Sequence, residues 1–287
     1  MSSLTRDEIA AAFIASCHDE IEAPKPGNVH AVAGGHDMEA RHFHNSARVA
    51  APAIAAPGAR VGLRVRHAVE ATVAEVQMNT NLGIILLCAP LGCAAEVGSR
   101  NLRGALVAVL EALDAEDAAN VYAAIARASP GGLGRAARYD VHDAPPSSLL
   151  AAMREAADRD IIARQYVTDF ADIFNTGLSA VDETRARGSD HSIALGVYLA
   201  FLSRFPDSHI ARKQGIAAAN AVMREAQGFA ARIGREAREP AFLCDLLGFD
   251  ARLKAKRINP GTSADLTVAT LFAARLCAVL PIPPGDG

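Results

Sequence analysis

The sequence predicts an all-α protein, a single multi-helix bundle over residues 1–287 with a polar site at converging helix ends. Apolar residues make up 51% of the chain and aromatic residues only 5%, and tryptophan is absent. This composition suits closely packed helices of small aliphatic residues. No apolar–polar alternation is long enough for a β-strand, and neither a fixed repeat nor a linker divides the chain. We therefore expect one all-α domain, and any boundary would fall in the loop region 129–148.

Capping residues mark the start of two helices. Thr5 and Glu8 have the spacing of a capping box, in which each side chain accepts a hydrogen bond from the other residue's backbone. Asp114 and Asp117 repeat this spacing before a second apolar run. The two caps predict helices that end near residues 22 and 128. Loops are expected after the helix that Asp114 caps, at 129–134 and 143–148.

Apolar residues at helical spacing predict the other helices. After Asp160 they recur every three or four positions, at Ile162, Tyr166, Phe170, Ile173 and Phe174. The remaining helices are expected at 39–54, 61–78, 80–97, 189–204, 208–233, 240–247 and 263–280. Pro90 should interrupt the third of these, because proline removes a backbone donor. The last is apolar on nearly all sides, so we expect it inside the bundle, with Thr262 as its cap and Asp265 reaching back.

Charge and motif content exclude several classes of function. The net charge of −3 gives no basic field for nucleic acid, and the glycine-rich loops of common nucleotide-binding folds are absent. The first residues do not resemble a signal peptide, and the longest apolar run is too short to cross a bilayer. Five cysteines without paired spacing do not form a disulfide framework. We expect a cytoplasmic protein with small-molecule partners and neither nucleic acid nor a membrane as partner. Its oligomeric state stays open, a homodimer included.

The candidate site lies in five short polar segments. They combine turn-forming residues with side chains that bind phosphate, metal or ribose, and they cover 25–28, 35–39, 79–83, 207–213 and 259–265. Such residues reduce packing energy and helix propensity, so their clustering needs a reason beyond folding. Only four of the 29 basic residues are lysines, and two of these, Lys25 and Lys213, lie in the polar segments. A compact ammonium retained in an arginine-rich chain favours a phosphate site. We interpret the polar segments as parts of one site.

The first two polar segments offer a phosphate cradle and a carboxylate. Lys25 and the tight turn at Gly27 are either a cradle for phosphate or an ordinary end of a helix. Asp37 is either the cap of the next helix or a carboxylate that binds Mg²⁺ or faces a developing cation. His36 lies beside it, in no spacing typical of zinc. Ser46, farther along the same helix, could donate to a phosphate.

The third polar segment opens a very apolar helix. Thr80 or Asn81 could cap this helix, which is the simplest interpretation. Asn79 and Asn81 lie beside a buried run, however, where an unsatisfied amide costs free energy. We therefore expect these amides to face a buried polar site and to bind ribose or a base.

The last two polar segments combine cations with hydroxyl and carboxyl groups. Arg212 and Lys213 either form an exposed basic face or neutralise a polyphosphate. Asn259 begins a rigid turn, and Ser263 and Asp265 follow at a helix start. A carboxylate repels phosphate, and a Mg²⁺ ion between the two would resolve this conflict.

The order of these motifs is that of a known enzyme family. The chain resembles the triphosphoribosyl-dephospho-CoA synthases, from about residue 8 to residue 276, in these motifs: Lys25-Pro26-Gly27, Gly35-His36-Asp37-Met38, Asn79-Thr80, and Asn259-Pro260-Gly261 followed by Ser263-Ala264-Asp265-Leu266. The resemblance implies an all-α enzyme with ATP and dephospho-CoA as substrates. Such an enzyme releases adenine and leaves a triphosphoribosyl group on the acceptor.

This reaction builds positive charge at the anomeric carbon, which a nearby carboxylate would stabilise. Our hypothesis is that Asp37 and Asp265 hold Mg²⁺ on the triphosphate or face the cation. The other polar residues would bind substrates, with phosphates at Lys25, Arg212 and Lys213, and ribose or base at Asn79 and Asn81.

The chain departs from the family in two places. Asn81-Leu82 stands where the family has His-Lys, and the family's Gly-Arg-Gly-Glu-Ala stretch has no counterpart. The third polar segment resembles a divergent branch that occurs with one-carbon carrier cofactors. Two alternatives stay open. One is a different acceptor, of the methanopterin or methanofuran type, and the other is a non-catalytic helical protein that binds a nucleotide.

Overall fold

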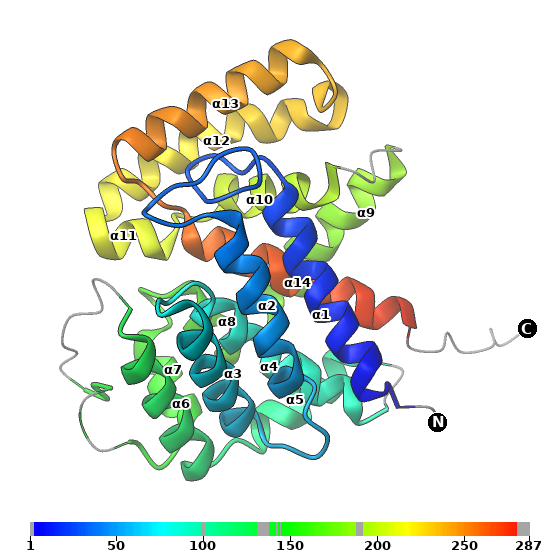
Figure 1. The fold of residues 1–287 in the computed structure, drawn as a ribbon, viewed down its shortest axis with the longest axis vertical. Coiled ribbons are helices and arrows are strands. Elements are labelled where there is room, and N and C mark those ends of the chain that lie inside the picture. The colour runs from blue at the N-terminus through cyan, green and yellow to red at the C-terminus, as the bar shows by residue number, and fades with distance from the viewer. Residues whose placement is uncertain are drawn as a thin grey trace, which may run out of the picture.

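The computed structural model describes residues 3–98, 101–130, 138–141, 143, 145–187 and 192–279. These residues form fourteen α-helices and one π-helix without any β-strand, which confirms the predicted all-α class (Figure 1). The helices, in chain order, are α1 (Arg6–Glu22), α2 (Ala40–Ile54), α3 (Val61–Val76), α4 (Leu82–Glu96), α5 (Leu102–Glu111), α6 (Ala115–Ala128), α7 (Leu149–Ala156), α8 (Ile161–Val167), the π-helix η1 (Asp172–Gly177), α9 (Leu178–Ala186), α10 (Ile193–Arg204), α11 (Ser208–Gln214), α12 (Ile216–Glu236), α13 (Pro240–Ala255) and α14 (Gly261–Val279).

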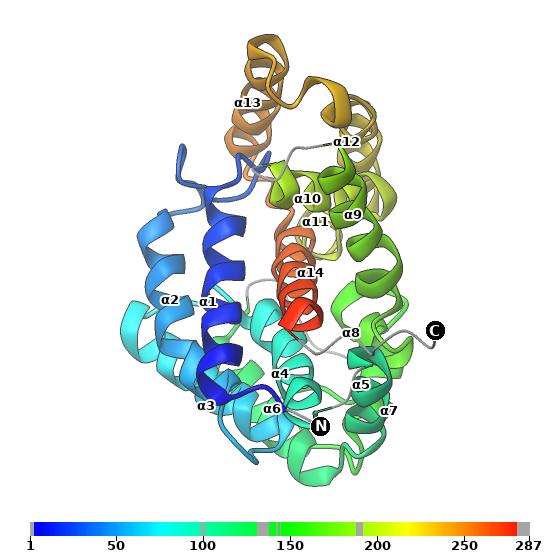
Figure 2. The same ribbon diagram turned by 90° about the vertical axis from the view of Figure 1, so that its right-hand side faces the viewer.

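Helix α14 is the central helix of the fold. It packs against α1, α4, α10 and η1, and Figure 2 shows it between α1 on one side and α8 and α9 on the other. Leu266 and Phe272 belong to the hydrophobic cluster built mainly from α1 to α8, whereas Leu271 belongs to the cluster built from α10 to α13. By length and composition α14 could cross a membrane, but 72% of its apolar window is buried within the protein. The prediction that this helix lies inside the bundle is confirmed.

Both predicted capping boxes are present. Thr5 Oγ1 accepts from the Glu8 N–H at 3.3 Å, and the Glu8 carboxylate accepts from the Thr5 N–H at 2.7 Å. Asp114 and Asp117 exchange the same pair of bonds at 3.1 and 3.3 Å. Asp117 is buried and also accepts from the Gly62 N–H at 2.8 Å. This cap therefore fixes the start of α6 against the start of α3.

Pro90 does not interrupt α4, and the predicted break is wrong. Proline at this position leaves the carbonyl oxygen of Leu86 without its helical N–H donor. The hydroxyl of Tyr166 in α8 donates to that oxygen at 2.7 Å, and both residues are buried. A hydrogen bond between two helices thus replaces the one that proline removes.

Tyr166→Phe should therefore destabilise the protein by about 1–3 kcal/mol, since it leaves the buried Leu86 carbonyl unpaired. In a Pro90→Ala background the same change should cost less, because the restored amide at position 90 donates to Leu86. Urea unfolding of the two single variants and the double variant measures this coupling. An equal cost of Tyr166→Phe in both backgrounds would contradict the explanation.

One predicted helix is divided at a glycine. The segment 208–233 forms α11 and α12, which are separated by Gly215 with a φ of 90° and a ψ of 157°. Glycine adopts this backbone conformation without a steric penalty. Gly215 is the sign of this break in the sequence, and the predicted helix ran through it.

The helix predicted after Asp160 is also divided. Asp169 and Phe170 have positive φ angles of 52° and 55°, and they separate α8 from η1. Arg164 and Gln165 at the end of α8 both donate to Asp172 in η1, at 2.7 and 2.6 Å. These side-chain bonds across the turn stabilise a break that propensity does not predict. Residues 131–134, 144, 189–191 and 280, parts of two predicted loops and two predicted helices, lie outside the described residues.

Candidate active site

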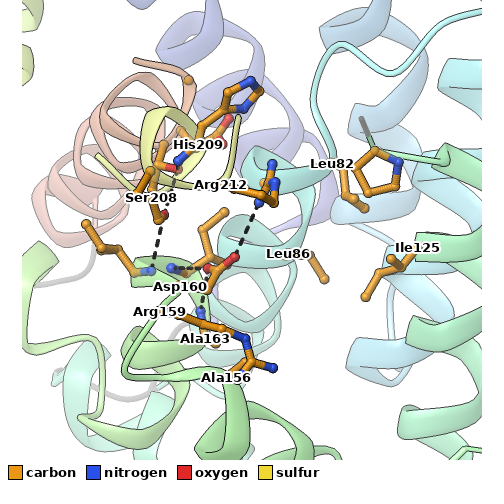
Figure 3. Close-up of a pocket in the computed structure, with 18 of the residues that line it drawn as sticks. Leu82, Leu86, Ile125, Ala156, Arg159, Asp160, Ala163, Ser208, His209 and Arg212 are labelled. Carbon is orange, nitrogen blue, oxygen red and sulfur yellow. Dashed lines mark hydrogen bonds and ion pairs between the residues drawn. The ribbon is translucent and has the colours of Figure 1, made fainter. Parts of the chain in front are cut away.

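A cavity of about 970 Å³ lies where the first turns of α4, α8, α11 and α14 meet. Its volume is at the upper end of the range for small-molecule sites. Figure 3 shows Ser208, His209 and Arg212 on one side of the cavity, and Leu82 and Ile125 on the other. The cavity thus has a polar side and an apolar side.

All five polar segments contribute to this cavity. Eight of the thirteen predicted site residues line it: His36, Asn79, Thr80, Asn81, Arg212, Lys213, Asn259 and Asp265. Asn28 adds a side chain from the first polar segment. The other five predicted residues, Lys25, Gly27, Asp37, Ser46 and Ser263, are not part of the lining. The structure therefore brings the polar segments together, but not every side chain that was expected to touch a ligand.

Lys25 lies behind the cavity wall. Its side chain is 0% exposed, and the ammonium donates to the Glu20 carboxylate, to Asn28 Oδ1 at 3.2 Å and to the Val29 carbonyl at 2.8 Å. These three acceptors use all three ammonium protons, so none is left for a phosphate. Burial lowers the pKa of Lys25 and raises the pKa of Glu20, while their mutual attraction opposes both shifts. Glu20 and Asn28 face the cavity in place of Lys25.

Gly27 and Ser46 also have partners within the protein. The Gly27 N–H donates to Asp250 at 2.8 Å, so the predicted backbone cradle is already occupied. His36 pairs with the Gly27 carbonyl through Nε2 at 2.9 Å. The Ser46 hydroxyl donates to the carbonyl of its own helix, and its oxygen pairs with the Thr80 hydroxyl at 2.6 Å. Ser46 therefore orients Thr80, which lines the cavity, and does not reach a phosphate itself.

Asp37 lies at the tip of a tight turn. His36 and Asp37 have φ angles of 55° and 64°, and backbone bonds of 3.0 and 2.9 Å between Gly35 and Met38 close the turn. The Asp37 side chain is exposed and is not the cap of α2, a position that Glu39 occupies. Among the described residues no group of three or more His, Cys, Asp or Glu side chains is suited to a metal. Asp265 lines the cavity and Asp37 does not, so the lining does not contain the predicted Asp37–Asp265 pair.

Asp207 joins the N-termini of α11 and α14. Its buried carboxylate accepts from the backbone N–H groups of His209 and Ile210, at 2.9 and 3.1 Å. The other oxygen accepts from the N–H and the hydroxyl of Ser263, at 2.7 and 2.8 Å. Burial raises the pKa of Asp207, and these four bonds oppose the rise. Ser263 is thus bound to Asp207, and Thr262, the predicted cap, instead accepts from the His209 N–H at 3.1 Å.

Asp265 lines the cavity against the first turn of α4. A Cβ atom on Gly83 would lie 2.1 Å from Oδ2 of Asp265, so only glycine lets the carboxylate approach this closely. Burial is the largest cause that raises the pKa of Asp265 well above its usual value. The negative charge of Asp207 raises it further, and the nearby Arg212 opposes the rise. A carboxyl group held in this way is typical of a functional site.

Gly83→Ala should lower activity while the protein stays folded. Alanine favours the helix, but its methyl group would force the Asp265 carboxylate out of position, and a displacement of this kind can cost about 10²-fold in rate. Gly228→Ala in α12 is the matched control, because a Cβ there meets no atom within 4 Å. The control should keep its activity and gain up to about 1 kcal/mol of stability. Native activity in a folded Gly83→Ala variant would contradict the role of the close approach.

Donor groups without partners point into the cavity region. His209 Nε2, Arg212 Nε and Asn81 Nδ2 are buried, and none has a hydrogen-bond partner within the described part of the chain. All three residues line the cavity. Burial, followed by the charge of Arg212, lowers the pKa of His209 to about 3, so this imidazole is neutral near pH 7. Buried polar atoms are rarely unpaired in proteins, so these three nitrogen atoms are candidates for contact with a ligand.

Many polar residues of the cavity were not predicted from the sequence, and four of them are informative. Asn28 and His209 lie within the polar segments but were not chosen, whereas Glu20 and Asp160 lie outside them. Asp160 caps α8 through bonds of 2.8 and 3.2 Å, and Arg212 lies 3.6 Å from its carboxylate (Figure 3). In the sequence, Asp160 was recognisable only as a possible helix cap. Glu20 carried a clearer signal, because it is an acidic residue on the buried face of α1.

Comparisons with known proteins identify the family. The family model for ATP:dephospho-CoA triphosphoribosyl transferase (CitG) matches residues 6–282. A crystal structure from Archaeoglobus fulgidus, described as a candidate triphosphoribosyl-dephospho-CoA synthase, is similar in fold, with a TM-score of 0.59 and 24% identity over 82% of this chain and 99% of that chain. No curated protein matches the chain. Since the family match covers nearly the whole sequence, the chain belongs to the ATP:dephospho-CoA triphosphoribosyl transferase family.

Proposed function

We propose that the cavity binds ATP and dephospho-CoA together and transfers the triphosphoribosyl group of ATP to a ribose hydroxyl of dephospho-CoA, with release of adenine. The observation that carries the proposal is the convergence of all five polar segments on one cavity, with Asp265 in its wall. The family match supports an enzyme over the non-catalytic alternative.

The triphosphate would bind on the polar side of the cavity. Arg212 and Lys213 supply positive charge there, and the neutral imidazole of His209 supplies a neutral polar group. The N-termini of α4 and α14 also point their backbone dipoles toward the cavity, which favours an anion. These groups take the place of Lys25, which was predicted to bind phosphate but lies outside the cavity lining.

The chemical step would take place at Asp265. The bond between the anomeric carbon and adenine breaks, and its electron pair leaves with adenine, which takes up a proton. The acceptor hydroxyl oxygen forms the new bond to the anomeric carbon and gives its proton to a base. The Asp265 carboxylate suits both requirements, since it can stabilise the developing cation and, with its raised pKa, accept that proton.

Mg²⁺ would bind together with the triphosphate. Mg²⁺ commonly takes one or two carboxylates and completes its shell with phosphate oxygens and water. Asp37 is exposed and outside the cavity lining, and Asp265 is assigned to the proton and the developing cation, so phosphate oxygens and water would supply most ligands of the ion. A bound ion would neutralise phosphate charge and lower the repulsion between the triphosphate and Asp265. Calorimetric titration of ATP with and without Mg²⁺ tests this part of the proposal.

The experiment that tests the function measures both products. Purified protein is incubated with ATP and dephospho-CoA, free adenine is quantified by chromatography, and the mass of the second product is determined. We expect adenine and a triphosphoribosylated dephospho-CoA in equal amounts. Product formation only with a pterin- or furan-type acceptor would support the alternative acceptor, and no adenine with any acceptor would contradict the proposal.

A further inference from the structure

We propose that the apolar side of the cavity binds the pantetheine arm of the acceptor, and that Asn81 donates a hydrogen bond to an amide carbonyl of that arm. This inference rests on the proposed function and assigns a subsite and a specificity-determining residue to it. The apolar side, called the apolar chamber below, is lined by Leu82, Leu86, Tyr122, Ile125 and Met153.

The apolar chamber is built from three helices, and the five side chains that define it are uncharged, while the cavity lining as a whole also includes Arg138, Asp140 and Glu155. Leu82 and Leu86 lie one turn apart on α4, Ile125 lies on α6 and Met153 on α7. Figure 3 shows Leu82 and Ile125 on the side of the cavity away from His209 and Ser208. A triphosphate would lose its hydration there without gaining a counter-charge, whereas apolar groups gain free energy in proportion to the area they bury. The chamber therefore suits an uncharged aliphatic part of a substrate.

Asn81 provides one polar group at the entrance to the apolar chamber. It directly precedes Leu82, it is only 5% exposed, and its Nδ2 has no partner among the described residues. Its neighbour Asn79 is engaged, because Asn79 Oδ1 accepts from the Leu82 N–H at 3.2 Å. A ligand carbonyl would satisfy the unpaired amide of Asn81, and this requirement makes the position selective.

The chemistry of dephospho-CoA matches this combination. Its pantetheine arm carries no charge, has a branched aliphatic carbon next to the hydroxyl, contains two amides and ends in a thiol. Aliphatic walls and one amide donor are complementary to such a chain. Tyr122, an aromatic residue of the chamber, already donates its hydroxyl to the Tyr139 carbonyl at 2.8 Å. The chamber thus offers aliphatic side chains beside a tyrosine ring whose hydroxyl is already bonded.

The position of Asp265 connects the two sides of the cavity. Its carboxylate lies against Gly83, two residues after Asn81. The positive charge of Arg212 on the polar side acts on the same carboxylate and lowers its pKa. With the arm in the apolar chamber and the triphosphate near Arg212, the two substrates approach this carboxylate from opposite directions. Transfer between them then requires no movement of either substrate across the site.

The first test compares acceptors with and without the arm. ADP contains the adenosine and diphosphate of dephospho-CoA but lacks pantetheine. We expect kcat/KM for transfer to dephospho-CoA to exceed that for ADP by about 100-fold, as the loss of a buried aliphatic chain implies. Equal use of the two acceptors by the native enzyme would overturn the inference and leave the proposed transfer reaction intact.

The second test uses Asn81→Leu, with Asn120→Leu on α6 as the matched control outside the cavity. Asn81→Leu should raise KM for dephospho-CoA by about 10-fold and affect KM for ATP and transfer to ADP much less, since it removes one hydrogen bond to the arm. The control should match the native enzyme in all three measurements. An equal loss with both acceptors would indicate a merely structural role for Asn81 and overturn the assignment.

Binding provides a readout that does not depend on transfer. Calorimetry with pantetheine alone should detect binding to the native protein and weaker binding to Asn81→Leu. Absence of pantetheine binding would overturn the inference, whether or not adenine is released. Absence of adenine release, together with pantetheine binding that depends on Asn81, would contradict the transfer reaction and retain the subsite.

Discussion

Asp265→Asn should reduce kcat by about 10²–10⁴-fold, because the variant can neither stabilise the developing cation with a charge nor accept the proton of the acceptor hydroxyl. Asparagine keeps the shape of the side chain beside Gly83, so substrates should still bind. Rates of adenine release at saturating ATP and acceptor measure the effect. Retention of more than about a tenth of the native kcat would exclude Asp265 from the chemical step.

The same variant should not lose stability, which separates a catalytic role from a structural one. The pKa of Asp265 is raised in the folded protein, so its contribution to stability is present below the unfolded pKa and is lost as the pH rises through the folded pKa. Asparagine has no such dependence. The stability of Asp265→Asn relative to the native protein should therefore increase as the pH rises from 4 to 8, measured by urea unfolding without nucleotide or Mg²⁺.

Two exposed carboxylates provide controls for this prediction. Asp182→Asn in α9 removes a charge far from the cavity lining and should leave kcat unchanged. Asp37→Asn tests the hypothesis, drawn from the sequence, that Asp37 binds Mg²⁺. If Asp37 were a magnesium ligand, its loss would raise the Mg²⁺ requirement of the reaction. Because Asp37 is exposed at the tip of a turn, we expect no more than a small effect.

Local signals in the sequence were sufficient for much of the fold. The capping boxes at Thr5 and Asp114 were predicted correctly because a cap depends on residues only three positions apart. The central position of α14 was predicted because a helix that is apolar on all sides must be buried. Both signals lie within one segment and need no knowledge of the neighbours.

The errors concern side-chain pairings that residue types alone do not specify, whether the partners are distant or near along the chain. Pro90 is accommodated within α4 only because Tyr166, 76 positions later, donates to Leu86, 80 positions earlier. Lys25 resembled a phosphate ligand because residue types do not show that its ammonium donates to the nearby Glu20 and Asn28. Residue types therefore identified where the site lies, whereas the side chains that face a ligand were decided by tertiary pairing.

Asp207→Ala should produce the largest loss of stability among the substitutions considered, about 2–4 kcal/mol. The change removes an acceptor from four donors, two at the start of α11 and two at Ser263 in α14, and of these the His209 N–H keeps Thr262 Oγ1 as a second acceptor. The cost of burying the carboxylate, which raises the pKa of Asp207, keeps the loss below the sum of four independent bonds. Urea unfolding gives the free energy of unfolding of the variant and the native protein.

Graded substitutions show whether the shared cap explains this loss. Ser263→Ala removes one of the four bonds and should cost about 1 kcal/mol, while Asp207→Asn keeps the acceptor for α11 but presents an amide donor to Ser263 and should cost an intermediate amount. KM for ATP should also rise in the order Ser263→Ala, Asp207→Asn, Asp207→Ala. The reason is that Asp207 fixes the first turns that carry Arg212 and Asp265 in one arrangement. A large loss of stability in Asp207→Asn without any change in KM for ATP would show that the cap supports the fold but does not position the site.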